Sequence, residues 1–183
     1  MARRKHPPHP YHNRLWKAAS AWTSFQHVRD TCDYILREQI QPDDPIYHPL
    51  ITAICVFYAR PFKRSKGIEN LTVQFVPKKF RPLHQLLILV RDQTAAHVDA
   101  QTKLLHHGQA ANRVRLIVLN RQVRLDVHYV GFKLATISEI RDLAIDLIKR
   151  MFDYTNKIIQ EYPSGVEDGE YLIDLTTGTF RRS

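Results

Sequence analysis

Residues 137–162 read ISEIRDLAIDLIKRMFDYTNKIIQEY, and this stretch decides the fold class. Apolar residues recur in it every three or four positions, which places them along one side of a helix. Ser138 is suited to cap the start of that helix, and Pro163 stops it, so a long helix ending near Tyr162 is predicted. The apolar positions are Ile137, Ile140, Ala144, Leu147, Met151, Tyr154 and Ile158.

Three further helices are predicted upstream of this one. Residues 11–39 carry one apolar stripe, and the prolines of residues 41–45 break the pattern. Residues 46–62 are apolar around most of their circumference, as expected of the most buried helix. A third helix starts at Arg81, because Pro82 suits a first helical turn. The chain is therefore predicted to be mainly α, with the four helices forming a bundle.

A β-hairpin is predicted at about residues 113–132, immediately before the last long helix. Its two halves alternate in polarity and are rich in β-branched residues, with residues 120–122 between them. Short strands are also expected at residues 71–76 and 171–175. The predicted organisation is a flexible basic arm at residues 1–10, one helical domain at 11–165 and a C-terminal tail at 166–183.

The chain is basic. Its 27 Lys and Arg residues outnumber 18 Asp and Glu residues, giving a formal charge of +9, which favours a polyanionic partner such as nucleic acid. Positive charge concentrates between residues 60 and 81, where Glu69 is the one acid among seven cationic residues. We expect RNA contacts from this cluster, the alternative being an ordinary solvated surface. The expected contacts are Arg60, Lys63, Arg64, Lys78, Lys79 and Arg81.

Several classes of protein are not supported by the sequence. No apolar run approaches the roughly 18 residues that a membrane span needs, and no apolar signal-peptide core follows the charged N-terminus, so a cytoplasmic protein without a membrane partner is expected. Cys32 and Cys55 lie in apolar-periodic stretches and are expected to be buried free thiols. Metal-ligand spacings and glycine-rich phosphate loops are missing, so neither a metal nor a cofactor is predicted.

The candidate chemistry lies in residues 86–99, which read LLILVRDQTAAHVD. An apolar helix leads into Arg91, and Asp92 follows directly. Five residues lie between Arg91 and His97. This pattern resembles the motif of the HEPN superfamily, in which a polar residue directly follows an arginine, and four to six residues lie between that arginine and a histidine. The resemblance extends to the helical architecture over about residues 12–162.

The resemblance implies a metal-independent endoribonuclease that acts as a homodimer, in which each cleft combines the arginines and histidines of two copies. Many members are toxins or other defence proteins that cleave RNA, so RNA and a cognate antitoxin are the other partners it implies. Some toxins of the superfamily carry a tyrosine two residues after the histidine, which a partner nucleotidyltransferase modifies. Asp99 stands there in this chain, so that mode of neutralisation is not expected.

The residue types suit this chemistry independently. Cleavage of RNA without a metal needs a base for the 2′-OH, an acid for the leaving oxygen and cations around the phosphate. Arg91 would bind phosphate, His97 would be the base or the acid, and Asp92 would orient one of them. On a continuous helix, six residues separate the first two side chains by about 120° and about 9 Å of rise, so the helix must bend or end, or the partner's copy must close the gap.

Other interpretations remain open on the sequence. Arg91 could pair with Asp92 or another acid at a helix end, while His97 satisfies a backbone carbonyl. His84, two turns before Arg91, is expected to make a satisfied polar contact rather than to enter the cleft. As a whole, the chain could be a non-catalytic HEPN-like module that binds nucleic acid or protein. It could also be a helical accessory protein that dimerises through the motif helix.

Overall fold

The computed structural model describes residues 10–63, 70–92, 105–106, 109–110, 114–119, 122–127, 131–162, 167–174 and 179–182. Several predicted features lie outside these ranges: residues 1–9 of the basic arm, Arg64, His97, Asp99, and residues 113, 120–121 and 128–130 of the predicted hairpin. Pro10, which the prediction placed in the arm, is the first residue of a helix. A proline can begin a helix because the first helical N–H has no partner within the helix.

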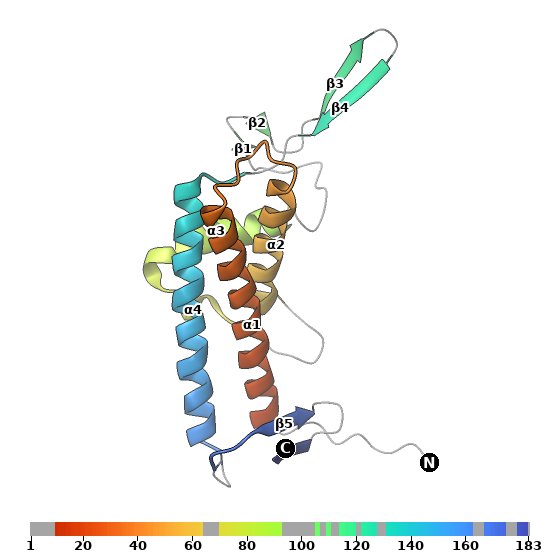
Figure 1. The fold of residues 1–183 in the computed structure, drawn as a ribbon. Helices are drawn as coiled ribbons and strands as arrows, with labels where there is room; N and C mark the ends of the chain where they lie inside the picture. The colour runs from red at the N-terminus through yellow and green to blue at the C-terminus, as the bar shows by residue number, and fades with distance from the viewer. Residues whose placement is uncertain are drawn as a thin grey trace, which may run out of the picture.

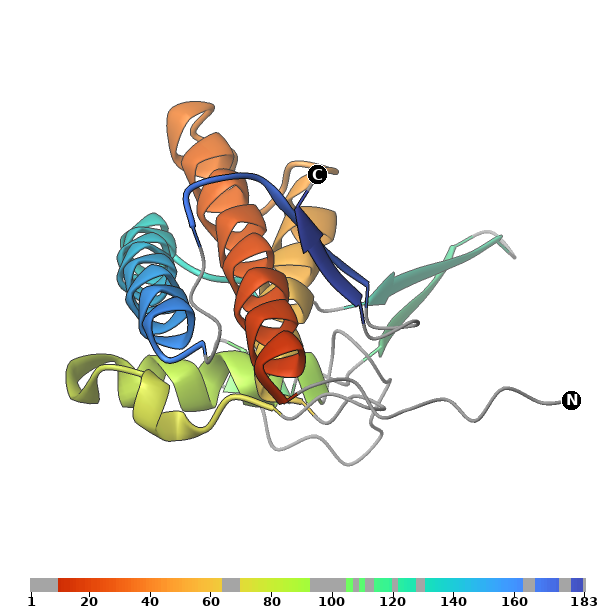
Figure 2. The same ribbon diagram turned by 90° about the horizontal axis from the view of Figure 1, so that it is seen from below.

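The described part of the chain is mainly α-helical, as predicted. Its four α-helices are α1 (Pro10–Arg37), α2 (Tyr47–Ala59), α3 (Arg81–Val90) and α4 (Leu134–Gln160). The two long helices α1 and α4 lie side by side in opposite directions, and α2 packs against α1 (Figure 1). Helix α3 contacts α2 and runs across the bundle rather than along it (Figure 2).

Ion pairs at both ends join the two long helices. Arg14 near the start of α1 contacts Glu161 just after α4, with an Nη2–Oε2 distance of 3.2 Å. At the other end, Arg141 of α4 pairs with Asp33 of α1. All four side chains are at least a third exposed, so these pairs add little stability and mainly favour the antiparallel register.

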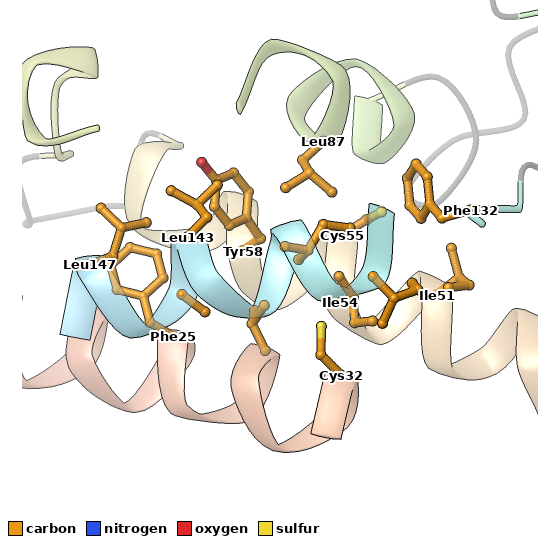
Figure 3. Close-up of a cluster of buried hydrophobic side chains, with 14 of the residues drawn as sticks. Phe25, Cys32, Ile51, Ile54, Cys55, Tyr58, Leu87, Phe132, Leu143 and Leu147 are labelled. Atoms are coloured by element: carbon orange, nitrogen blue, oxygen red, sulfur yellow. The ribbon is translucent and has the colours of Figure 1, made fainter. Parts of the chain in front are cut away.

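One apolar core receives side chains from all four α-helices (Figure 3). Phe25 of α1, Tyr58 of α2, Leu87 of α3 and Leu147 of α4 are fully buried in it. The two cysteines are buried free thiols, as predicted, and burial raises the pKa of each to about 12. Core burial of this kind supplies most of the stability of a helical bundle.

The start of α4 differs from the prediction. The helix begins at Leu134, with Lys133 as its flanking residue, so Ser138 lies inside the first turns and does not cap them. The chain entering the helix is held instead by Tyr47, whose hydroxyl donates to the carbonyl of Phe132 and accepts from its N–H. This buried contact fixes Phe132 two residues before the helix starts.

The strand expected at residues 71–76 is not formed. A short 3-10 helix, Val73–Phe75, occupies this segment, and two more, Arg60–Phe62 and Lys78–Phe80, lie before and after it. A strand needs a neighbour for its main-chain groups. Here Leu71 N–H instead donates to Pro61 O at 2.7 Å, and Phe75 and Val76 bond to carbonyls three residues earlier.

Three antiparallel hairpins complete the described elements. The predicted hairpin before α4 is confirmed as β3 (Val114–Leu119) and β4 (Gln122–Val127), while β1 (Leu105–His106) and β2 (Gln109–Ala110) form a shorter hairpin before it. The strand expected near Tyr171 is β5 (Tyr171–Asp174), which pairs with β6 (Thr179–Arg182). Within the described ranges, no helix is both long enough and apolar enough to cross a bilayer.

Candidate functional site

The α-helical part of α3 ends at Val90, one residue before the motif arginine. Arg91 and Asp92 continue the helix as a π-type turn, while the N–H of Arg91 still donates to the carbonyls of Leu87 and Ile88. The sequence predicts that the third helix brings Arg91 and His97 to its C-terminal part. His97 lies outside the described residues, so the structure gives no separation between the two side chains.

Asp92 gathers two cations at this end of α3. Its Oδ1 accepts a hydrogen bond from Arg91 Nη1 at 2.9 Å, and its Oδ2 accepts one from Lys63 Nζ at 2.5 Å. Lys63 follows the 3-10 helix at the end of α2, so the cluster joins segments 29 residues apart. The side chains of Lys63, Arg91 and Asp92 are 34, 30 and 38% exposed, which leaves the cluster open to a ligand.

The charge of this Lys63–Asp92–Arg91 cluster is set by the carboxylate. Burial alone would raise the pKa of Asp92, but the hydrogen bonds and charges of Lys63 and Arg91 outweigh burial and lower it below the ordinary value. Asp92 is therefore ionised at neutral pH, and the cluster carries one net positive charge. Such a site attracts an anion while holding both cations in place.

His84 lies in the same region and is buried. Its Nδ1 is 2.9 Å from the hydroxyl of Tyr58, and its ring meets that of Phe62 edge-on, with centroids 4.7 Å apart. Burial, followed by the positive charge of Lys63, lowers its pKa. The expected satisfied polar contact is therefore present, made by Tyr58, and His84 is neutral at neutral pH.

Three of the other predicted RNA contacts lie away from Arg91. Lys78, Lys79 and Arg81 lie at the opposite end of α3, about 15 Å away along its axis. Lys78 and Lys79 are exposed, and the ammonium of Lys79 lies 4.4 Å from the ring centroid of Phe80. Arg60 is exposed at the end of α2. The structure thus brings together Lys63, Arg91 and Asp92 from the predicted set.

Two contacts of the site were not predicted from the sequence. The first is that Lys63 binds Asp92, because no local pattern tells which cation of a basic cluster will meet a distant carboxylate. The second is the contact between Tyr58 of α2 and His84 of α3, which lie 26 residues apart in sequence. Its one sequence signal is a polar histidine on the inner face of an apolar helix, since a buried imidazole needs a polar partner.

Comparisons with protein-family models, curated proteins and solved structures found no match for this chain. Within the described residues, no group of three or more His, Cys, Asp or Glu side chains is arranged to hold a metal ion.

Proposed function

We propose that this protein is a metal-independent endoribonuclease that cleaves RNA by attack of a 2′-OH, at a site built from two copies of the chain. A role as a toxin or phage-defence effector follows from the same HEPN resemblance. The observation that carries the proposal is the Lys63–Asp92–Arg91 cluster. It joins the motif arginine to a second cation, in a partly exposed place at the end of the motif helix.

Each residue has a role in this proposal. Arg91 and Lys63 bind the non-bridging oxygens of the phosphate and stabilise the charge that grows on them. Asp92 is a positioning residue, because its two carboxylate oxygens hold those two cations apart from one another. His97, five residues after Asp92, exchanges the protons.

The reaction balances without a co-reactant. The O2′–P bond forms as the P–O5′ bond breaks, a base takes the proton of the 2′-OH, and an acid gives a proton to the leaving O5′. The products are a 2′,3′-cyclic phosphate and a 5′-hydroxyl end. The histidines of two copies would serve as the base and the acid, which is why the proposal includes a homodimer.

The test is cleavage of RNA by the purified protein in EDTA, with the ends of the fragments identified. We expect 2′,3′-cyclic phosphate ends, and losses of about 10²-fold or more in rate for Arg91→Ala and for His97→Ala. Lys149→Ala is the matched control, because it removes an exposed cation of α4 away from the cluster. Intact RNA with the wild-type protein, or equal rates for wild type and His97→Ala, would overturn the proposal.

A non-catalytic nucleic-acid-binding module is the second candidate, and one observation favours it. Asp92 already pairs with both Arg91 and Lys63, as in an ion-pair cluster that simply ties the end of α2 to the end of α3. In that case RNA would bind without being cut, and Arg91→Ala and His97→Ala would leave the affinity nearly unchanged. Binding and cleavage measured on the same variants separate the two candidates.

A further inference from the structure

The β3–β4 hairpin stands away from the helical bundle (Figure 1). Leu116 and Val118 of β3 and Val123 of β4 are 60, 58 and 63% exposed. The sheet has two strands within the described chain, so both of its outer edges are free there. An isolated two-stranded hairpin is marginally stable in water, and a free edge of this length readily pairs with another strand.

The sequence of β4 is complementary to itself. Residues 123–127 read Val-Arg-Leu-Asp-Val. If two copies of β4 run antiparallel with Leu125 opposite Leu125, each Val123 faces a Val127 and each Arg124 faces an Asp126. Opposite charges and aliphatic residues are the favourable cross-strand pairs.

The strand register fits the same pairing. Leu125 is the partner of Leu116 within the hairpin, and Leu119 and Gln122 flank the two-residue connection. Hydrogen-bonded and non-hydrogen-bonded pairs alternate along an antiparallel ladder, and the pair that flanks a two-residue connection is usually bonded. Counted from that pair, Leu125 and Leu116 form a non-bonded pair. The main-chain N–H and C=O of Leu125 therefore face the outer edge of β4, where a second copy would need them.

Strand β3 lacks this property. Residues 114–118 read Val-Arg-Leu-Ile-Val, so antiparallel pairing about Leu116 would place Arg115 opposite Ile117. The β4 edge also has no aromatic residue on which a nucleic-acid base could stack. Its complementarity is thus to its own sequence, which points to a second copy of this chain as the partner.

We propose that two copies of the protein pair through their β4 strands, antiparallel about Leu125, into one four-stranded sheet with the order β3–β4–β4–β3. The two-fold axis passes beside Leu125. This inference deepens the homodimer on which the proposed function rests, while its support comes from β4 alone. It places one contact of that dimer at the hairpins, and the composite site at Arg91 requires the ends of α3 of the two copies to meet as well.

The sharpest test is a disulfide at the proposed axis. In the dimer, Leu125→Cys places two thiols on directly opposed residues, whose Cα atoms are about 5.5 Å apart, a separation that a disulfide spans. Cys32 and Cys55 are buried, so they do not compete. The control is Leu116→Cys, one strand further from the axis. Under mild oxidation we expect the first variant to become a covalent dimer on non-reducing gels, and the second to stay a single chain.

Charge reversal gives a second test that needs no new cysteine. In the Arg124→Asp variant, the new aspartate of each copy lies opposite Asp126 of the other copy, so two pairs of like charges replace two pairs of opposite charges. The dimer dissociation constant should therefore rise about 10-fold in sedimentation equilibrium. Reversing residues 115, 124 and 126 together (R115D, R124D, D126R) restores every opposite-charge pair, within the hairpin and across the axis, and should restore the dimer. Lys149→Asp on α4 is the matched control and should leave the dimer intact.

These outcomes separate the β4 contact from the nuclease. If Leu125→Cys forms the crosslink specifically and the protein leaves RNA intact, the β4 contact is supported and the proposed nuclease activity is wrong. A wild-type protein that stays monomeric at high concentration, or equal crosslinking at positions 116 and 125, overturns the β4 contact, whether or not RNA is cut. A crosslink at 125 to a different protein in place of a second copy would also overturn it.

Discussion

At the scale of single residues, Asp92 is the centre of the proposed site. It contacts the motif arginine next to it and a lysine 29 residues away. The sequence marked Asp92 as an orienting group from its place after Arg91, and the observed contacts suit that role. Lys63, by contrast, was predicted only as one of several RNA contacts, because its partner is set by how α2 and α3 pack.

Asp92→Asn should lower the free energy of unfolding at pH 7 by at most about 1 kcal/mol, because solvent screens an ion pair that is about a third exposed. The folded-state pKa of Asp92 is lowered, so its contribution is present above the ordinary value of 3.8 and disappears as the pH falls through the folded-state value. Urea unfolding of both proteins should therefore converge at strongly acidic pH. A difference that grows on acidification would contradict this assignment.

Lys63→Met should raise the pKa of His84. Burial, first, and the charge of Lys63, second, hold that pKa below its ordinary value of 6.5, and the substitution removes the second cause. The measurement is an NMR titration of the His84 ring protons, with Lys79→Met as the control. An unchanged titration midpoint in Lys63→Met would show that the two groups do not lie close together.

The pH dependence of stability follows from the direction of the His84 shift. Since the folded protein disfavours the protonated ring, His84 contributes stability above pH 6.5, and this contribution is lost as the pH falls from 6.5 towards the folded-state value. His84→Gln should therefore flatten the loss of stability over that range in urea unfolding at a series of pH values. An equally steep loss in wild type and variant would contradict the assignment.

At the scale of elements, the periodicity of apolar residues predicted the helices, because each helix buries one row of apolar side chains against the same core. It located α1, α2 and the body of α4, whose apolar residues recur without interruption. It did not locate the start of α4 or the end of α3. Those points depend on the Tyr47–Phe132 contact and on a π-type turn, which local patterns do not encode. The strands of β1–β2 were missed because two residues are too short to show alternation.

The buried apolar side chains of the helices should contribute more to the free energy of unfolding than the apolar side chains on their exposed faces. Phe25→Ala in α1 removes a fully buried ring and should cost about 3–5 kcal/mol of unfolding free energy. Phe152→Ala in α4 removes a ring that is 62% exposed and should cost less than about 1 kcal/mol. Urea denaturation compares the two, and a larger loss for Phe152→Ala would mean that another surface covers this face of α4.

At the scale of the whole molecule, the charge of +9 predicts affinity for RNA that depends on salt. The logarithm of the binding constant should fall linearly with the logarithm of the salt concentration. Replacing Lys78 and Lys79 together by Gln should reduce the slope by about 1.4, because each phosphate contact to a single strand contributes roughly 0.7. Lys149 and Lys157 of α4, replaced together, are the control, and equal changes in both variants would show that RNA does not select the α3 side.

The central claim is that RNA is cut through its own 2′-OH at the site of Arg91. The most direct measurement uses two RNAs of identical sequence, one of which has a single 2′-deoxy sugar on the 5′ side of the mapped cleavage position. In EDTA, we expect the all-ribose RNA to be cut there and the deoxy-substituted RNA to stay intact at that one position. Cleavage of both RNAs at the same rate and position would contradict the account.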